Sequence, residues 1–418
     1  MACLLADSLA RPLDYAFVLN LGQSSHAVTD FEPLYRGAEG ARHAFPVAGS
    51  RLRQPPFDIP SWETQPGTPP ALVIRVFPEG ERVLRIQEFL ETPFSLQEGP
   101  PLRQMLLGIG DPPSWSLVTQ VHHAASDLIG TLLFVQRQLR MARGLETMPP
   151  RPQVVPPELL ETPRGARRNP AARPSAALAT RPGPASASRR WRTITVPREP
   201  LASLSQTVGG FRWNDCLLAA ALDALAAWNL QQSVSADRIG LWVPMNTRTE
   251  RLRGFGNGVS RIRVHREALS GAKSRAFLER CRSVRRIVHR KKRTGEWAVP
   301  PVPVPAPLFP VAAPFLRRWL YRPWADFGTA GFTHLETWPG EEDPVLSEIS
   351  GMEVIACLHE RHPLFFAAMS RGEQTAVTIT WDPALLRDED IDFIAAAFEA
   401  PLVDPPFLRS GQPWTRPH

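Results

Sequence analysis

The sequence is poor in cysteine, and its first residues do not have the composition of a leader. Four cysteines occur among 418 residues, without CxxC spacing: Cys3, Cys216, Cys281 and Cys357. This usage argues against a disulfide framework and against a cysteine-based zinc site. The N-terminal stretch lacks the basic and apolar regions of a secretory signal peptide. We therefore expect a protein of the reducing cytoplasm.

Long uninterrupted apolar runs are also scarce, with one exception. Residues 298–316 carry no charge and are nearly long enough to span a bilayer. The segment contains seven prolines, which exclude a regular helix and favour an extended, polyproline-like loop. Basic residues flank it on both sides, so contact with a membrane or a lipid stands as the alternative to packing within the protein.

The remaining composition is typical of a globular protein. Hydrophobic residues make up 43% and charged residues 21% of the chain, which argues against a mainly disordered protein. The length suits two lobes of about 150–200 residues each. The formal net charge of +7 is modest for this length. It gives little support to nucleic-acid binding and is compatible with an acidic partner or a phosphate-bearing ligand.

A shift in composition divides the chain into three parts. Between residues 148 and 192 the sequence becomes rich in Pro, Arg and Ala. We expect residues 1–147 to form an N-terminal lobe, residues 148–192 an extended, solvated linker, and residues 193–418 a C-terminal lobe. A docking patch formed by the linker arginines is the alternative.

Apolar periodicity predicts a mixture of strands and helices, and hence an α/β (α+β) fold with non-parallel sheets. Asn214 is the expected N-cap of an alanine-rich, buried helix. The expected strands are residues 71–77, 83–86, 116–121, 191–196, 239–243, 262–264, 353–358, 364–369 and 376–381. The first expected helix begins near residue 31. Four more are expected at residues 131–142, 213–228, 276–293 and 388–398.

The most specific motif is VHHAASD, which contains His122, His123 and Asp127 and directly follows the strand predicted at 116–121. A strand end can hold the backbone of an imidazole rigidly while the ring faces a cleft. A neutral imidazole with a pKa near 6.5 can accept a proton from a hydroxyl or an amine. The aspartate can brace the loop, preferably by pairing with an arginine from elsewhere in the chain.

Three other roles are open to the histidine pair. A metal site is disfavoured because adjacent strand residues point to opposite faces, and no HExxH or third-ligand spacing is present. A purely structural pair is the second alternative. A Ser-His-Asp triad is the third, and it lacks a GxSxG elbow.

HHAASD resembles the HHxxxDG motif of the condensation-domain and chloramphenicol-acetyltransferase-like acyltransferases, which include nonribosomal peptide condensation domains and wax ester synthases. Other stretches resemble further motifs of this superfamily in the same order along the chain. They are residues 91–106 (ETPFSLQEGPPLRQML), Asn214–Asp215 with the following LLAAAL, residues 243–248 (VPMNTR), Gly256–Asn257 and residues 375–381. The glycine that follows the motif aspartate in the family is replaced by Leu128 here.

The resemblance implies two chloramphenicol-acetyltransferase-like lobes arranged in a V, with an active-site tunnel at their junction. It assigns the catalytic role to His123 and a structural role to His122. Asp127 is expected to point away from the substrate and to pair with Arg248. Asn257 is expected to support the site from the second lobe.

The implied activity is transfer of an acyl group from a thioester to an amine or alcohol acceptor, in secondary metabolism such as nonribosomal peptide synthesis. The donor would be acyl-CoA or a phosphopantetheine-linked acyl group on a carrier protein, with no bound cofactor and no metal. Two alternatives are a wax ester synthase or alcohol O-acyltransferase acting on lipids, and a non-catalytic, condensation-like docking module.

Overall fold

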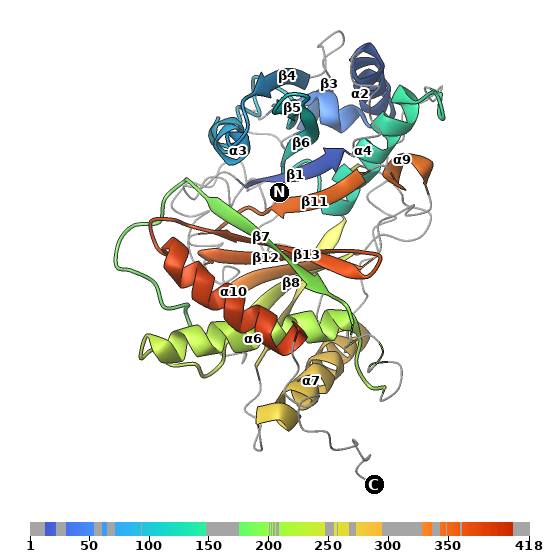
Figure 1. Ribbon diagram of the computed structural model, residues 1–418. Coiled ribbons are helices and arrows are strands. Elements are labelled where there is room, and N and C mark those ends of the chain that lie inside the picture. The colour runs from blue at the N-terminus through green and yellow to red at the C-terminus, as the bar shows by residue number, and fades with distance from the viewer. Residues whose placement is uncertain are drawn as a thin grey trace.

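The computed structural model describes most of the chain and places two sheets next to each other (Figure 1). The described residues are 13–21, 31–53, 61–64, 72–92, 94–147, 175–199, 201, 203, 205, 209–246, 255–256, 258–266, 273–294, 328–336, 343–347, 349–359 and 362–403.

The first lobe is built on a five-stranded sheet with the order β11-β1-β6-β5-β4. Only β4 and β5 run parallel; the other neighbours are antiparallel. One face packs against α2 and α4, and the other packs against α3. These elements are β1 (Asp14–Leu21), α2 (Glu32–Ala44), β4 (Leu72–Phe77), α3 (Arg82–Glu91), β5 (Leu102–Ile109), β6 (Ser114–His122), α4 (Leu128–Ala142) and β11 (Ile349–Ile355). A short helix and a two-stranded sheet accompany them: η1 (Pro46–Gly49), β2 (Ser50–Arg53) and β3 (Ser61–Thr64).

The second lobe is built on a six-stranded sheet with the order β7-β13-β12-β10-β8-β9. Strand β10 runs parallel to both of its neighbours, and the remaining pairs are antiparallel. Helices α6, α7 and α10 lie together on the outer face (Figure 1). The elements are β7 (Arg190–Pro197), α6 (Trp213–Gln231), β8 (Gly240–Asn246), β9 (Val259–His265), α7 (Lys273–Thr294), β10 (Ala330–Leu335), β12 (Leu364–Arg371), β13 (Gln374–Trp381) and α10 (Asp388–Val403). The short helix α9 (Pro344–Ser347) instead packs against α4 and β11 of the first lobe.

The side chains of β12 show how the two lobes share a core. Successive residues of a strand point to opposite faces of its sheet. Leu364 and Phe366 accordingly join the apolar cluster that contains α6 and α10. Phe365 and Ala367 join a second cluster, which contains the buried residues of β1, β6 and α4. The second sheet is therefore apolar on both faces, and its inner face packs against the first lobe.

Strand β11 departs from the predicted division of the chain. It lies within residues 193–418, yet it pairs with β1 and so forms one edge of the first sheet. Its neighbours in sequence return to the second sheet as β10 and β12. The C-terminal part of the chain thus crosses into the first lobe and back.

Two local predictions were wrong, whereas the mixed α/β class is confirmed. Residues 83–86 belong to helix α3 rather than to a strand, because Ile86 and Leu90 are buried one turn apart while Val83 is 52% exposed. Four apolar-rich residues are too few to distinguish the two periods. Helix α6 is capped by Arg212, whose backbone N donates to Oδ2 of Asp215 at 2.8 Å, and not by Asn214.

Residues 175–189, within the predicted linker, have no regular secondary structure but are attached to the second lobe. The backbone N of Ala179 donates to Oδ1 of Asn229 at 2.8 Å. Ser186 donates to the carboxylate of Asp382 through its backbone N and its hydroxyl, at 3.0 and 2.7 Å. The linker residues before 175 lie outside the described part of the chain. None of the described helices is long and apolar enough to cross a membrane.

Candidate active site

The predicted histidine pair lies where β6 ends. This strand is the middle strand of the first sheet, and it is buried from Ser116 to His122. His122 is only 1% exposed, and its Nδ1 accepts a hydrogen bond from the backbone N of Ala124 at 3.1 Å. Its ring lies edge-on to Phe94, with 6.3 Å between the ring centroids. His122 is thus enclosed by protein, as a structural role would require.

His123 is the first residue of the turn after β6, and it is half-buried. Its backbone N donates to the carbonyl of Leu13 at 2.8 Å. Burial lowers the pKa of His123 below the ordinary histidine value, and the negative charge of Asp127 only partly opposes this effect. The imidazole is therefore neutral at pH 7 and able to accept a proton.

Tyr15 on β1 holds the ring of His123 from one side. The two ring centroids are 5.1 Å apart, and the ring planes are tilted by 57°. The phenolic oxygen of Tyr15 is hydrogen-bonded to Oγ1 of Thr131 on α4 at 2.6 Å. Tyr15 is 4% exposed, so the phenol has little room to move. Sequence reasoning missed this contact because nothing local connects residue 15 with the motif.

Asp127 is the N-cap of α4, and it also binds a loop of the second lobe. Its Oδ1 accepts from the backbone N of Gly130 at 2.9 Å, as N-cap residues do. Its Oδ2 accepts from the backbone N of Gly258 at 2.6 Å, and its own backbone N donates to the carbonyl of Gly256 at 3.2 Å. The carboxylate therefore joins the start of α4 to the chain around residue 256.

The close approach of this loop explains why residue 130 is a glycine. Leu128 is the first residue of α4, so it needs no positive φ. The glycine is required at residue 130 instead, where an added Cβ would lie 2.4 Å from Oγ of Ser126 and 2.8 Å from the carbonyl O of Gly256. The backbone N of Gly256 also donates to Oγ of Ser126 at 3.2 Å.

We expect Gly130→Ala to lower the melting temperature, although alanine is the better helix former. The added methyl group must displace the loop at Gly256, and such overpacking typically costs about 1–3 kcal/mol. The matched control is Gly99→Ala, because a Cβ there would meet only the carbonyl of Ser95 at 3.9 Å. Equal melting temperatures for the two variants would show that the loop does not constrain residue 130.

Two predicted site residues and one segment cannot be placed. Arg248 and Asn257 lie outside the described residues, as do residues 298–316. The pairing of Asp127 with Arg248, the supporting role of Asn257 and the tunnel between the lobes therefore stay predictions.

A half-buried histidine of the second lobe, His334 on β10, was missed by sequence reasoning. Its Nδ1 is 3.1 Å from Oδ1 of Asn214, and its Nε2 is 2.8 Å from Oγ of Ser370. Burial, together with the positive charge of Arg198, lowers the pKa of His334 to about 3. The ring is therefore neutral, and it connects α6 with β12 inside the second lobe.

Metal ligation is one of the alternative roles that the sequence leaves open for the histidine pair. Across the parts of the chain that the structure describes, no group of three or more His, Cys, Asp or Glu side chains could hold a metal ion.

No family model and no curated protein matches this sequence, whereas solved structures match the fold over nearly its whole length. The first condensation domain of the calcium-dependent antibiotic synthetase, in complex with a substrate analogue, has a TM-score of 0.68 and 15% identity, covering 96% of this chain and 95% of that chain. TRI3 trichothecene 15-O-acetyltransferase from Fusarium sporotrichioides has a TM-score of 0.68 and 13% identity, covering 96% and 93%.

The X-domain from teicoplanin biosynthesis is a third similar structure. Its TM-score is 0.62 and its identity 17%, covering 97% of this chain and 93% of that chain. The same X-domain matches in its complex with OxyB. The TM-scores establish the fold, whereas sequence identities this low leave the activity open. The expectation from the histidine motif is confirmed at the level of the fold: the chain has the fold of condensation domains and of the acetyltransferase named above.

Proposed function

We propose that the protein is an acyltransferase that moves an acyl group from a thioester to an amine or an alcohol, with His123 as the general base. The observation that carries the proposal is the neutral imidazole of His123, held at the end of a central strand by Leu13 and Tyr15. The fold supports the same reaction class, because an O-acetyltransferase shares it.

The chemistry uses one proton acceptor. His123 takes the proton of the acceptor amine or hydroxyl while the acceptor N or O attacks the thioester carbonyl carbon. The tetrahedral intermediate then collapses: the C–S bond breaks, and the protonated imidazole returns the proton to the departing thiolate. A C–N or C–O bond replaces the C–S bond, so the exchange balances without a further reagent. Holding both reactants together supplies the rest of the acceleration.

The donor in this proposal is acyl-CoA or an acyl group on the phosphopantetheine arm of a carrier protein, and the acceptor is a small molecule of secondary metabolism in the cytoplasm. The formal net charge of +7 suits an acidic carrier or a phosphate-bearing donor. The test is mass spectrometry of the products formed from a panel of acyl-CoA and acyl-carrier thioesters, each mixed with amine and alcohol acceptors. Thioester hydrolysis alone, or no acyl product with any pair, would overturn the proposal.

The pH dependence follows from the lowered pKa of His123. The reactive form is the unprotonated one, so kcat/KM should stay level around pH 7 and fall as acid protonates the ring. We expect the midpoint of this fall below 6.5, with about tenfold loss per pH unit beyond it. The profile is to be measured within the pH range where the near-UV circular dichroism of the protein is constant. A midpoint above 6.5 would contradict the assignment.

A second candidate function is suggested by the similar X-domain, which was solved in complex with OxyB. A protein of this fold could bind a partner enzyme without turning over a thioester. Stable binding of a carrier protein by the wild type, with no acyl product in the panel above, would favour this candidate.

A further inference from the structure

Residues 13 and 14 hold the backbone of both motif histidines. Asp14 is the first residue of β1 and is paired with His122 in the antiparallel β1–β6 ladder. The carbonyl of Leu13 accepts the backbone N–H of His123 at 2.8 Å. Any shift of residues 13 and 14 would therefore move the peptide from which the proposed base projects.

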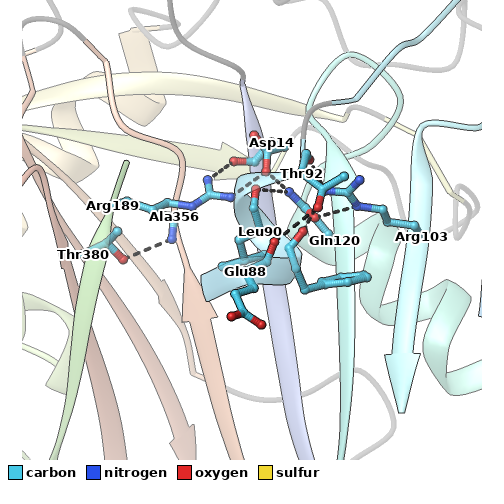
Figure 2. A network of polar contacts seen from close by, with 10 residues as sticks. Asp14, Glu88, Leu90, Thr92, Arg103, Gln120, Arg189, Ala356 and Thr380 are labelled. Atoms are coloured by element: carbon cyan, nitrogen blue, oxygen red, sulfur yellow. Dashed lines mark hydrogen bonds and ion pairs between the residues drawn. The ribbon is translucent and has the colours of Figure 1, made fainter. Parts of the chain in front are cut away.

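The side chain of Arg189 fixes Asp14 through two hydrogen bonds (Figure 2). Its Nη1 donates to the backbone O of Asp14, and its Nη2 donates to Oδ2 of the same residue, both at 2.5 Å. Asp14 is 2% exposed and Arg189 is 9% exposed. A pair so well shielded from water is little screened, and its geometry is restricted by both bonds.

Further polar groups close around the carboxylate of Asp14. Nε2 of Gln120, on the neighbouring strand β6, also donates to Oδ2. Arg103 on β5 in turn donates to Oε1 of Gln120 at 2.8 Å, and its own guanidinium reaches the carbonyl of Phe89 at 2.8 Å. Burial lowers the pKa of Arg103 to about 10. Three strands of the first sheet and α3 thus meet at the contact that Arg189 makes.

Arg189 itself belongs to the second lobe. It directly precedes β7, the edge strand of the second sheet. Three residues earlier, Ser186 donates twice to the buried carboxylate of Asp382, and the backbone N of Arg181 donates to the carbonyl of Leu385 at 3.0 Å. The arginine therefore extends from a segment that is already held by the second lobe.

The motif is consequently attached to the second lobe on both sides. On the side of β1, Arg189 holds Asp14, and the adjacent Leu13 accepts the backbone N–H of His123. Asp127, bonded to Gly256 and Gly258, holds the end of the motif. We propose that Arg189 is a positioning residue that fixes the backbone of His123 relative to the second lobe. Its effect on catalysis rests on the proposed function, whereas its effect on the His123 backbone does not.

The experiment compares Arg189→Met and Arg189→Lys with Arg190→Met. Arg190 is the neighbouring arginine, but its side chain is 52% exposed and pairs with the equally exposed Asp388, so it controls for loss of one positive charge. The first readout is the hydrogen-exchange rate of the His123 amide, resolved by NMR, with amides of β13 as an internal reference. The second readout is kcat and KM for the acyl transfer found in the thioester panel.

We expect Arg189→Met to accelerate exchange of the His123 amide about tenfold or more over Arg190→Met, with β13 unchanged. Arg189→Lys should restore part of the protection, because an ammonium can reach one oxygen of Asp14 but cannot bond two in the same fork. In an active enzyme kcat should fall about tenfold while KM changes little, since the base rather than substrate binding is disturbed.

Unchanged exchange at His123 in both Arg189 variants would overturn the inference. Equal acceleration in both sheets would also overturn it, because the pair would then be a general stabilising contact. If Arg189→Met does not fold, the His123 exchange rates of Arg189→Lys and Asp14→Asn, each compared with Arg190→Met, test the inference instead. A wild type without transferase activity would refute the proposed function, and the exchange rates would still decide the role of Arg189.

Discussion

Replacing His123 with alanine is expected to abolish measurable acyl transfer and to leave the fold intact. Removing a general base of this type typically costs about 10²–10⁴-fold in rate. The fold should survive because the hydrogen bond to Leu13 is made by the backbone of residue 123, which alanine retains. The side chain mainly contributes a half-buried ring beside Tyr15.

The measurement is the initial rate of thiol release and of product formation with the best donor and acceptor pair. His289→Ala is the matched control, because that histidine is exposed on α7. The control should retain the wild-type rate, and both variants should melt within a few degrees of the wild type. Undiminished transfer by His123→Ala would show that this imidazole is not the base.

Replacing Asp127 with alanine should give the largest loss of stability among the residues of the motif. The side chain is 1% exposed, and it accepts from the backbone N of Gly130 and from that of Gly258. Loss of the N-cap bond costs about 1 kcal/mol, and loss of the second, charge-assisted bond costs about 1.5–3 kcal/mol. Both donors would also be left buried without this acceptor.

The melting temperature from calorimetry or circular dichroism tests this expectation. Asp237→Ala is the control, because Asp237 is exposed, and a surface substitution of this kind usually changes stability by less than about 0.5 kcal/mol. Asp127→Asn should fall between the two, since the amide retains one acceptor oxygen. Transfer should weaken as well, because the motif would lose one attachment to the second lobe. Equal melting of Asp127→Ala and Asp237→Ala would contradict the bracing role.

The parts of the fold that the sequence predicted are those with a local signal. The strand before the histidines and the alanine-rich helix α6 were found because each is a local run of mostly apolar residues whose length suits a buried strand or a buried helix. The pairing of β11 with β1 was not predictable in the same way. It joins residues 349–355 to residues 14–21, and the sequence of neither strand indicates which other strand it pairs with.

In the candidate site, too, the residues with a local signal were predicted and the long-range contacts were not. His122, His123 and Asp127 were identified because they are contiguous in one motif. The groups that hold them come from elsewhere: Tyr15 from β1, and Arg189 from the segment before β7. Composition assigned the linker arginines to solvent, and only the structure shows that Arg189 is buried against a carboxylate.

The departure at Leu128 illustrates how a motif can mislead in its details. The family motif has a glycine directly after the aspartate, and this sequence has Leu128 there. In the structure residue 128 is already helical, and the need for a small residue arises from the nearby Gly256 backbone, which meets Gly130. The requirement is set by a contact with the second lobe, and a local pattern could not reveal it.

The late position of β11 in the chain bears on how the protein is synthesised. Until residue 355 has left the ribosome, this edge of β1 lacks its partner strand, and none of the strands described within residues 1–147 pairs with it. Such edges pair readily with other chains and promote aggregation. Expression of residues 1–147 alone would leave this edge without β11, so the first lobe needs the C-terminal part of the chain to complete its sheet.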